Sequence, residues 1–214
     1  MKILAIIGTN RRNGLVERLC KKVIDGASEN GHECELINLF DFKIGNCIGC
    51  WKCVKNNECV LNDDFDKILE KFKEAKVIIL GIPCYWSNVP GIVKTFFDRH
   101  TGPAMFKPVD GANFVNLKTT VKIKKIINAL KNFGALPMYS QKRFWLISAM
   151  TYPFPKALIS GDYKGLINAV KHYAHKLKCK SFNYLVFTDS LFRFIKNKEE
   201  RYLRKAYIIG QNIK

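Results

Sequence analysis

The sequence predicts an α/β fold, in which a doubly wound parallel sheet has helices on both faces. Three apolar runs rich in Ile, Leu and Val lie at 2–7, 76–83 and 143–150, and such runs are typical of strands buried on both faces. Segments with apolar residues at helical spacing alternate with them, as in βαβ units. The chain has 214 residues and 48% apolar content, so we expect one well-packed domain over residues 1–214.

The expected elements of the first hundred residues follow this alternation. The run KILAII ends at Gly8, and after the loop GTNRRNG apolar residues recur at helical spacing until Asn30-Gly31 supplies a stop signal. KVIILGIP is the clearest buried strand in the chain. The strands expected here are 2–7, 34–37 and 76–83, and the expected helices are 15–30, 64–74 and 92–99.

The second part of the chain resumes the pattern after an interruption. Residues 100–142 combine a loop-like stretch with the basic amphipathic segment TVKIKKIINALKNF, and we interpret them as a basic insertion before the fourth strand. The elements expected after it are the strands 143–150 and 181–187 and the helices 163–177 and 198–209. The predicted sheet therefore has five strands.

Positive charge is concentrated in the second part of the chain. The formal net charge is +18, and residues 101–214 contain 21 Lys and Arg but only 5 Asp and Glu. Such a surface attracts polyanions, which include nucleic acid, phosphorylated cofactors and acidic protein partners, or it serves solubility alone. No RNA- or DNA-reading motif accompanies the charge, so a basic nucleic-acid-binding module is the least favoured interpretation.

The N-terminal segment carries no recognisable targeting signal. The apolar run MKILAIIG is interrupted by polar Thr9 and two arginines before a signal peptide or a membrane span is complete. We therefore expect a cytoplasmic protein that does not associate with membranes. Disulfides are rare in that compartment, so a cluster of cysteines is expected to hold metal or to take part in redox chemistry.

The loop after the first strand has the properties of an anion-binding site. In a doubly wound sheet, ligands bind at the carboxyl ends of the strands, where this loop meets the N-terminus of a helix. Thr9 offers a hydroxyl, Arg11 a positive charge and Asn13 an amide, and the backbone N–H groups of Leu15 and Val16 begin the helix. The alternative is an ordinary basic turn, because neither a dinucleotide fingerprint nor a P-loop is present.

A second candidate binding loop, PCYWSNVPG at 83–91, follows the third strand. We expect its Tyr85, Trp86, Ser87 and Asn88 at the same edge of the sheet. Aromatic groups beside small polar ones suit a flat heteroaromatic ligand. The alternative is that these aromatic residues only cover a helix end.

Four of the eight cysteines lie within thirteen positions, in the segment CIGCWKCVKNNEC. They are spaced C-x2-C-x2-C-x5-C, at Cys47, Cys50, Cys53 and Cys59. Zinc sites more often use two C-x2-C pairs that are far apart, whereas three thiolates at successive x2 spacings wrap one side of a [4Fe-4S] cluster. We therefore predict one [4Fe-4S] cluster here, with zinc or no metal as the alternatives. Asp63 and Asp64 are expected to cap the helix that follows.

Together these motifs resemble those of the flavodoxin-like NADPH-dependent FMN reductases, and within them the iron–sulfur flavoproteins. Three motifs match in order, GTNRRNG after the first strand, CIGCWKCVKNNECVLNDD after the second and IPCYWSNVPGIVKTFFDR after the third. The C-terminal stretch NKEERYLRKAYIIGQNI is also similar to the last helix of the family. The resemblance covers most of residues 1–100 and the tail. It implies a flavodoxin-like sheet in the order 2-1-3-4-5 with FMN at the point where the strand order reverses.

The resemblance also implies roles for particular residues. Those implied for the FMN phosphate are Thr9, Arg11, Asn13, Leu15 and Val16; for the isoalloxazine Pro83, Tyr85, Trp86, Ser87, Asn88, Ser148 and Thr151; and for the cluster Cys47, Cys50, Cys53 and Cys59. Many relatives have N-G-N-T where this chain has N-G-L-V, so Leu15 and Val16 offer only backbone groups to the phosphate.

The expected function is that of an FMN-dependent oxidoreductase that passes electrons between FMN, a [4Fe-4S] cluster and a redox partner. The cofactors carry this chemistry, so no catalytic side-chain acid or base is demanded. The alternative is an NAD(P)H-dependent FMN or quinone reductase without a cluster. The expected partners are NAD(P)H and an acidic electron carrier such as ferredoxin, and the resemblance implies a homodimer or homotetramer.

Overall fold

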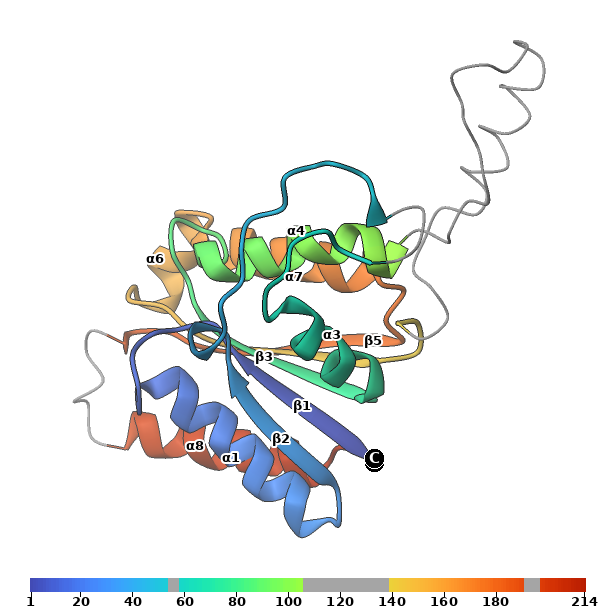
Figure 1. Cartoon of the computed structure of the whole chain (residues 1–214). Coiled ribbons are helices and arrows are strands. Elements are labelled where there is room, and N and C mark those ends of the chain that lie inside the picture. The colour runs from blue at the N-terminus through green and yellow to red at the C-terminus, as the bar shows by residue number, and fades with distance from the viewer. Residues whose placement is uncertain (54–57, 106–138, 191–196) are drawn as a thin grey trace.

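Five parallel strands form one sheet in the order β2-β1-β3-β4-β5 (Figure 1). This computed structural model describes residues 1–53, 58–105, 139–190 and 197–214. The strands are β1 (Lys2–Ile7), β2 (Glu33–Asn38), β3 (Val77–Pro83), β4 (Arg143–Ala149) and β5 (Ser181–Phe187). Their order and direction confirm the flavodoxin-like, doubly wound sheet that the sequence predicts.

Helices cover both faces of the sheet (Figure 1). One face is covered by α1 (Leu15–Glu29) and α8 (Lys198–Gln211), and the other by α3 (Phe65–Glu74), α4 (Gly91–Met105) and α7 (Asp162–Lys176). A short 3-10 turn, η1 (Leu39–Asp41), follows β2, and the short helix α6 (Phe154–Ile159) precedes α7. None of the helices in the described ranges is long and apolar enough to cross a membrane.

The inner strands are buried because both of their faces are covered. Residues Ile3 to Ile7 of β1 are at most 2% exposed. Alternate residues of each strand enter opposite cores, so that Leu146 packs in the core beneath α3, α4 and α7 while Ile147 packs in the core beneath α1 and α8. This arrangement explains why the inner strands appear in the sequence as continuous apolar runs.

Helix α4 is longer than the sequence predicts. We expected it to end at Arg99 and the basic insertion to begin at residue 100, but α4 continues to Met105. The physical reason is that His100, 1% exposed, extends the buried stripe of Val93 and Phe96 by another turn. Residues 100–105 therefore belong to the helix. The expected basic helix within TVKIKKIINALKNF lies outside the described residues.

The carboxyl ends of the strands carry the loops of functional interest. Because the strands are parallel, the loops after β1, β3 and β4 meet at one edge of the sheet. The cysteine segment instead follows β2 and η1, and Figure 1 shows that it leaves the sheet and arches over to α4 before it returns to α3. The fold thus positions two separate groups of candidate residues.

Candidate functional site

A cavity of about 190 Å³ lies at the carboxyl edge of the sheet, between the N-terminus of α1 and the loops after β3 and β4. Its lining residues come from four segments of the chain. They are Thr9, Arg11, Gly14, Leu15, Val16, Pro83, Cys84, Tyr85, Ala149, Thr151 and Ser190. The cavity therefore lies where the strand order reverses, which is the usual ligand site of a doubly wound sheet.

The N-terminus of α1 gives one end of this cavity the properties of an anion site. The N-cap residue, Gly14, makes no side-chain hydrogen bond to the helix, and the first N–H groups of a helix have no intrahelical partners. Thr9 Oγ1 accepts the Arg11 N–H at 3.2 Å, so the hydroxyl proton remains free to be donated. Together with the Arg11 charge, these donors fit a phosphate group.

Glu17 shapes the same loop, although sequence reasoning missed it. Its buried carboxylate accepts the Asn13 N–H at 2.8 Å and pairs with Lys21 Nζ at 2.8 Å. The hydrogen bond to Lys21 lowers the Glu17 pKa more than burial raises it, and the Asn13 N–H lowers it further. Asn13 has a left-handed φ of 54°, its side-chain Oδ1 accepts from Lys21 Nζ at 3.3 Å, and it does not line the cavity. A Glu three residues after a helix N-cap is the signal that would have found it.

The loop after β3 forms a tight turn beside the cavity. The backbones of Tyr85 and Asn88 exchange hydrogen bonds of 3.1 and 2.9 Å, and the two residues between them, Trp86 and Ser87, have φ values of 49° and 58°. Positive φ at two non-glycine residues costs on the order of 1–3 kcal/mol each, and such strain is concentrated at functional sites. The Ser87 hydroxyl bonds to Asp162 of α7, which pins the turn. Trp86 is 99% exposed as a result.

The structure brings some of the predicted FMN residues together and separates others. The predicted residues that line the cavity are Thr9, Arg11, Leu15, Val16, Pro83, Tyr85 and Thr151. Those that do not line it are Asn13, Trp86, Ser87, Asn88 and Ser148. The lining residues that sequence reasoning missed are Gly14, Cys84, Ala149 and Ser190. Ser190 follows β5, so the rule that ligands bind at carboxyl strand ends would have included it.

Ser148 lies on the opposite face of the sheet from the cavity. It is fully buried, and its hydroxyl has no partner among the described residues. Strand alternation places it on the same face as Leu146, beneath α3, α4 and α7, whereas Ala149 faces the cavity. Of the two residues predicted after the fourth strand, only Thr151 therefore reaches the cavity.

The four clustered cysteines line a second, smaller cavity of about 30 Å³. The other lining residues come from the described parts of the same segment and from α4, which contributes Asp98, Arg99 and Gly102. Cys47 and Cys50 are exposed, whereas Cys53 and Cys59 are partly buried. Burial raises the pKa of the Cys53 thiol, and the neighbouring cysteines add to this shift because like charges repel.

Four thiols around one space fit the ligand set of an iron–sulfur cluster. Within the described ranges, no group of three or more His, Cys, Asp or Glu side chains is arranged to hold a single metal ion. Arg99, which lines the cavity, contributes a further observation: its Nε is buried and has no hydrogen-bond partner among the described residues. A bound thiolate or sulfide would give that N–H an acceptor.

The other four cysteines lie in the two cores or pack against them. Cys20 is fully buried, and Cys34 and Cys179 pack against the two cores. Burial raises the pKa of Cys84 and of Cys179 to about 11, so both thiols are protonated at neutral pH. Cys84 differs from the others because it also lines the cavity at the carboxyl edge of the sheet.

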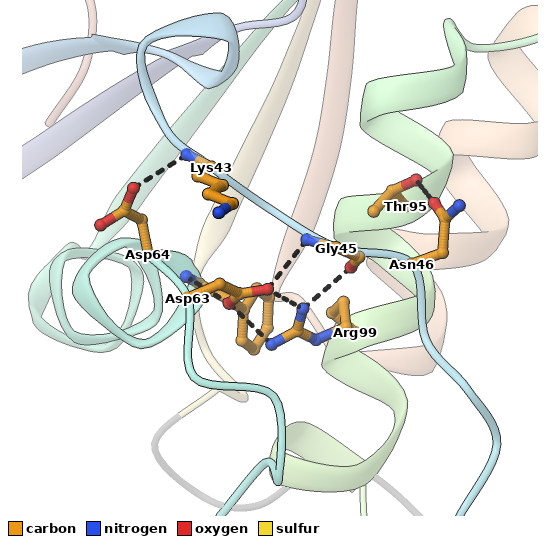
Figure 2. A network of polar contacts seen from close by, with 8 residues as sticks. Lys43, Gly45, Asn46, Asp63, Asp64, Thr95 and Arg99 are labelled. Carbon is orange, nitrogen blue, oxygen red and sulfur yellow. Dashed lines mark hydrogen bonds and ion pairs between the residues drawn. The ribbon is translucent and has the colours of Figure 1, made fainter.

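Asp63 has a larger role than the helix cap that the sequence predicts. Its Oδ1 accepts the Phe65 N–H at the start of α3 at 3.0 Å, whereas Asp64, which occupies the N-cap position, makes no side-chain capping bond. It also forms an ion pair with Arg99 of α4, at 2.6 Å between Oδ2 and Nη1 (Figure 2). Asp64 instead accepts the backbone N–H of Lys43. The two carboxylates therefore connect the start of α3 to the segment before the cysteines.

Comparison with known proteins agrees with this geometry. A family model described as NADPH-dependent FMN reductase matches residues 1–143. An iron-sulfur flavoprotein of Archaeoglobus fulgidus is 36% identical over an alignment of 175 residues, which covers 76% of this chain and 82% of that protein. The iron-sulfur flavoprotein MJ1083 of Methanocaldococcus jannaschii is 39% identical over 99 residues, 46% of this chain and 51% of that protein.

Among solved structures, an NAD(P)H:quinone oxidoreductase from Methanothermobacter marburgensis superposes with a TM-score of 0.75 at 13% identity, over 100% of this chain and 99% of that one. This likeness supports the fold alone. The chain belongs to the NADPH-dependent FMN reductase family, within its iron–sulfur flavoprotein subgroup. It is accordingly an FMN-dependent oxidoreductase.

Proposed function

We propose that this oxidoreductase passes electrons between FMN and a [4Fe-4S] cluster, and from there to a redox partner. The observation that carries the proposal is the gathering of Cys47, Cys50, Cys53 and Cys59 around one cavity, where Arg99 has an unpartnered buried N–H. The spacing C-x2-C-x2-C-x5-C suits one cluster better than a zinc site. Several similar proteins are named iron-sulfur flavoproteins, which supports the same assignment.

In this proposal, the cavity at the carboxyl edge of the sheet holds the flavin. Thr9, Arg11 and the first amides of α1 bind the phosphate through charge-assisted hydrogen bonds. Tyr85 and Pro83 flank the ring, and Trp86, which is exposed at the tip of the adjacent turn, is free to cover it. Asn13, Ser87 and Asn88 then act by shaping these loops.

The two cofactors have complementary electron chemistry. A bound flavin exchanges a hydride or single electrons and a bound cluster exchanges one electron, so the pair connects a two-electron donor to a one-electron carrier. The protein's part is to bind and orient both groups and to set the charge around them. No catalytic acid or base is required for such transfer.

A second candidate function is an NAD(P)H-dependent FMN or quinone reductase without a cluster. It is favoured by the small size of the cysteine cavity, about 30 Å³, and by the lack of a metal-ion site among the described residues. One similar protein, from Bacillus subtilis, is named a putative NAD(P)H-dependent FMN-containing oxidoreductase. In this case the cysteines are free thiols.

The proposal extends to partners and location. NAD(P)H is the expected electron donor, and the basic second part of the chain suits an acidic carrier such as ferredoxin. We expect a cytoplasmic homodimer or homotetramer. A monomer in sedimentation, with no salt-sensitive binding of ferredoxin, would contradict the assembly and the carrier.

The experiment that tests the function is an anaerobic preparation with iron, acid-labile sulfide and FMN quantified per chain. Near four irons and one FMN are expected for the wild-type protein, by the composition of the cofactors. The variant Cys53→Ala should lose iron and keep FMN, while the matched variant Cys179→Ala should keep both. One FMN without iron, together with steady turnover of NADPH, would support the second candidate instead.

A further inference from the structure

We propose that the buried ion pair between Asp63 and Arg99 is a clasp that positions the described parts of the cysteine loop, residues 44–53 and 58–62, and that Arg99 offsets the negative charge of the four cysteine ligands. This inference rests on the proposed cluster. The clasp belongs to the protein itself, however, and its positioning effect exists before any cluster binds. No feature of the sequence pattern predicts the pair, because its members are 36 residues apart.

The two ends of the cysteine loop are joined at their base (Figure 2). The Asp64 N–H bonds to the Lys43 carbonyl at 2.9 Å, and the Lys43 N–H bonds to Asp64 Oδ2 at 2.8 Å. One step further along, the Gly45 N–H bonds to Asp63 Oδ2 at 2.8 Å. The segment therefore leaves and rejoins the fold at a single place.

Arg99 belongs to α4 and connects this base of the loop to that helix. Its Nη1 contacts Asp63 Oδ2 at 2.6 Å and its Nη2 contacts Oδ1 at 2.9 Å, so the pair is bidentate. Nη1 also bonds to the Gly45 carbonyl at 2.8 Å. Both ends of the loop are thus tied to one guanidinium. The Cζ atom of that group lies over the Phe65 ring, 4.6 Å from its centre, which limits its movement.

Burial makes this clasp different from the other ion pairs between described residues. The Arg99 and Asp63 side chains are 1% and 8% exposed, and in every other such pair at least one side chain is 18% exposed or more. Removing one member of a buried pair leaves the other charge uncompensated, whereas exposed pairs contribute little. Asp63 is also fully bonded, because Gly45 and Phe65 donate to the oxygens that Arg99 contacts.

Arg99 also faces the cysteines. It lines their cavity together with Gly102 and Asp98, and Asp98 is already paired with Lys94 at the surface. Burial lowers the Arg99 pKa, but the hydrogen bonds to Asp63 and the charge of Cys59 raise it more, so the guanidinium stays charged. Because both Nη atoms already donate hydrogen bonds, Nε is the guanidinium atom that remains available to a cysteine thiolate. Hydrogen bonds and net charge near the sulfurs are among the factors that set a cluster's reduction potential.

The test uses two variants. Asp63→Asn removes the negative charge with little change in shape, and Arg99→Lys keeps the positive charge but loses the bidentate contact of the guanidinium. The matched control is Glu35→Gln, which removes the carboxylate of an exposed pair with Lys71 elsewhere on the surface. In metal-free protein, amide hydrogen exchange across residues 44–62 should accelerate at least tenfold in both clasp variants and remain unchanged in the control. FMN content should equal that of the wild type in all three.

In reconstituted protein, a chelator should remove iron from Asp63→Asn about 10–100 times faster than from the wild type, in line with other supporting contacts around metal ligands. The variant Arg99→Gln should move the cluster's midpoint potential to a more negative value and leave the FMN potential in place. Arg99→Lys should have the wild-type cluster potential but not the wild-type protection of the cysteine loop against hydrogen exchange. If Arg99 had only a structural role, the potential and the exchange rate would change together.

Three outcomes would overturn the inference. Unchanged exchange across residues 44–62 in both clasp variants would remove the positioning role. An unchanged cluster potential in Arg99→Gln would remove the electrostatic role. If Asp63→Asn does not fold, unaltered exchange in Arg99→Lys is sufficient to reject the clasp. If the wild type takes up no iron, the proposed cluster fails, whereas the exchange experiment still decides whether the clasp holds the loop.

Discussion

Cys53 lies directly against Gly102 of α4, so closely that a Cβ atom on residue 102 would come within 1.9 Å of the cysteine Sγ. The substitution Gly102→Ala should therefore push Cys53 away from the other three cysteines and lower the iron content per chain severalfold. The matched control is Gly91→Ala on the same helix, where an added Cβ meets nothing within 4 Å. Circular dichroism would check the fold. Equal iron content in both variants would contradict the packing.

The proposed phosphate site at the N-terminus of α1 can be tested with a flavin that lacks the phosphate. Thr9→Val and Arg11→Gln should each weaken FMN binding about tenfold or more, since a hydrogen bond to a charged group contributes about 1.5–3 kcal/mol. Binding of riboflavin, which has no phosphate, should change little in either variant. Fluorescence titration gives both dissociation constants. A parallel loss of riboflavin affinity would place the phosphate elsewhere.

Trp86 should report on flavin binding because its side chain is 99% exposed at the tip of a strained turn. Addition of FMN should quench the most red-shifted tryptophan emission, which comes from the most hydrated indole. In Trp86→Phe that component should be absent before FMN is added, while the fold and the other two tryptophans remain. If FMN leaves the red-shifted emission of the wild type unaltered, Trp86 does not contact the ring.

His100 should make the protein less stable in mild acid. The ring is 1% exposed among Phe65, Phe72 and Phe96; its Nδ1 bonds to the Phe96 carbonyl at 2.9 Å, and its Nε2 has no partner among the described residues. Burial, together with the charges of Lys73 and Arg99, lowers the His100 pKa to about 4, although the hydrogen bond to Phe96 raises it.

The unfolded chain therefore binds a proton at His100 at a higher pH than the folded chain does. As the pH falls from about 6.5 to about 4, this group alone should reduce the free energy of unfolding by roughly 3 kcal/mol. Urea denaturation at several pH values should show that the free energy of unfolding depends less on pH in His100→Leu than in the wild type. The control is His172→Gln, whose side chain is exposed on α7 and which should show the wild-type dependence. Identical slopes in His100→Leu and the wild type would contradict the assignment.

Much of the fold could be predicted because the inner strands are buried on both faces and appear as continuous apolar runs. The end of α4 could not be predicted, because a histidine after a buried stripe usually indicates a surface position. Only its aromatic packing shows that His100 continues the stripe. The helix α6 was also missed. It is six residues long and has a proline in its first turn, too short for a periodic pattern.

The candidate site was predicted at the level of loops more than of side chains. The rule for carboxyl strand ends predicted Thr9 and Tyr85 at the same edge of the sheet, and both line one cavity there. It could not show that Ser87 turns toward Asp162, because positive φ at two successive non-glycine residues is rare and has no sequence signature. The ion pair of Asp63 with Arg99 could not be predicted either, because an arginine on a helix is usually a solvated surface residue.

The hydrogen bonds between Lys43 and Asp64 have an implication for how such proteins diversify. A segment whose two ends meet at one point is exchangeable as a cassette: residues 46–62 can be replaced by a short turn while the strands and the flavin loops remain as they are. One scaffold can then serve as a two-cofactor protein or as a simple flavoenzyme, depending on a single graft. Such a graft would also provide designers with a form of this chain that lacks the four clustered cysteines.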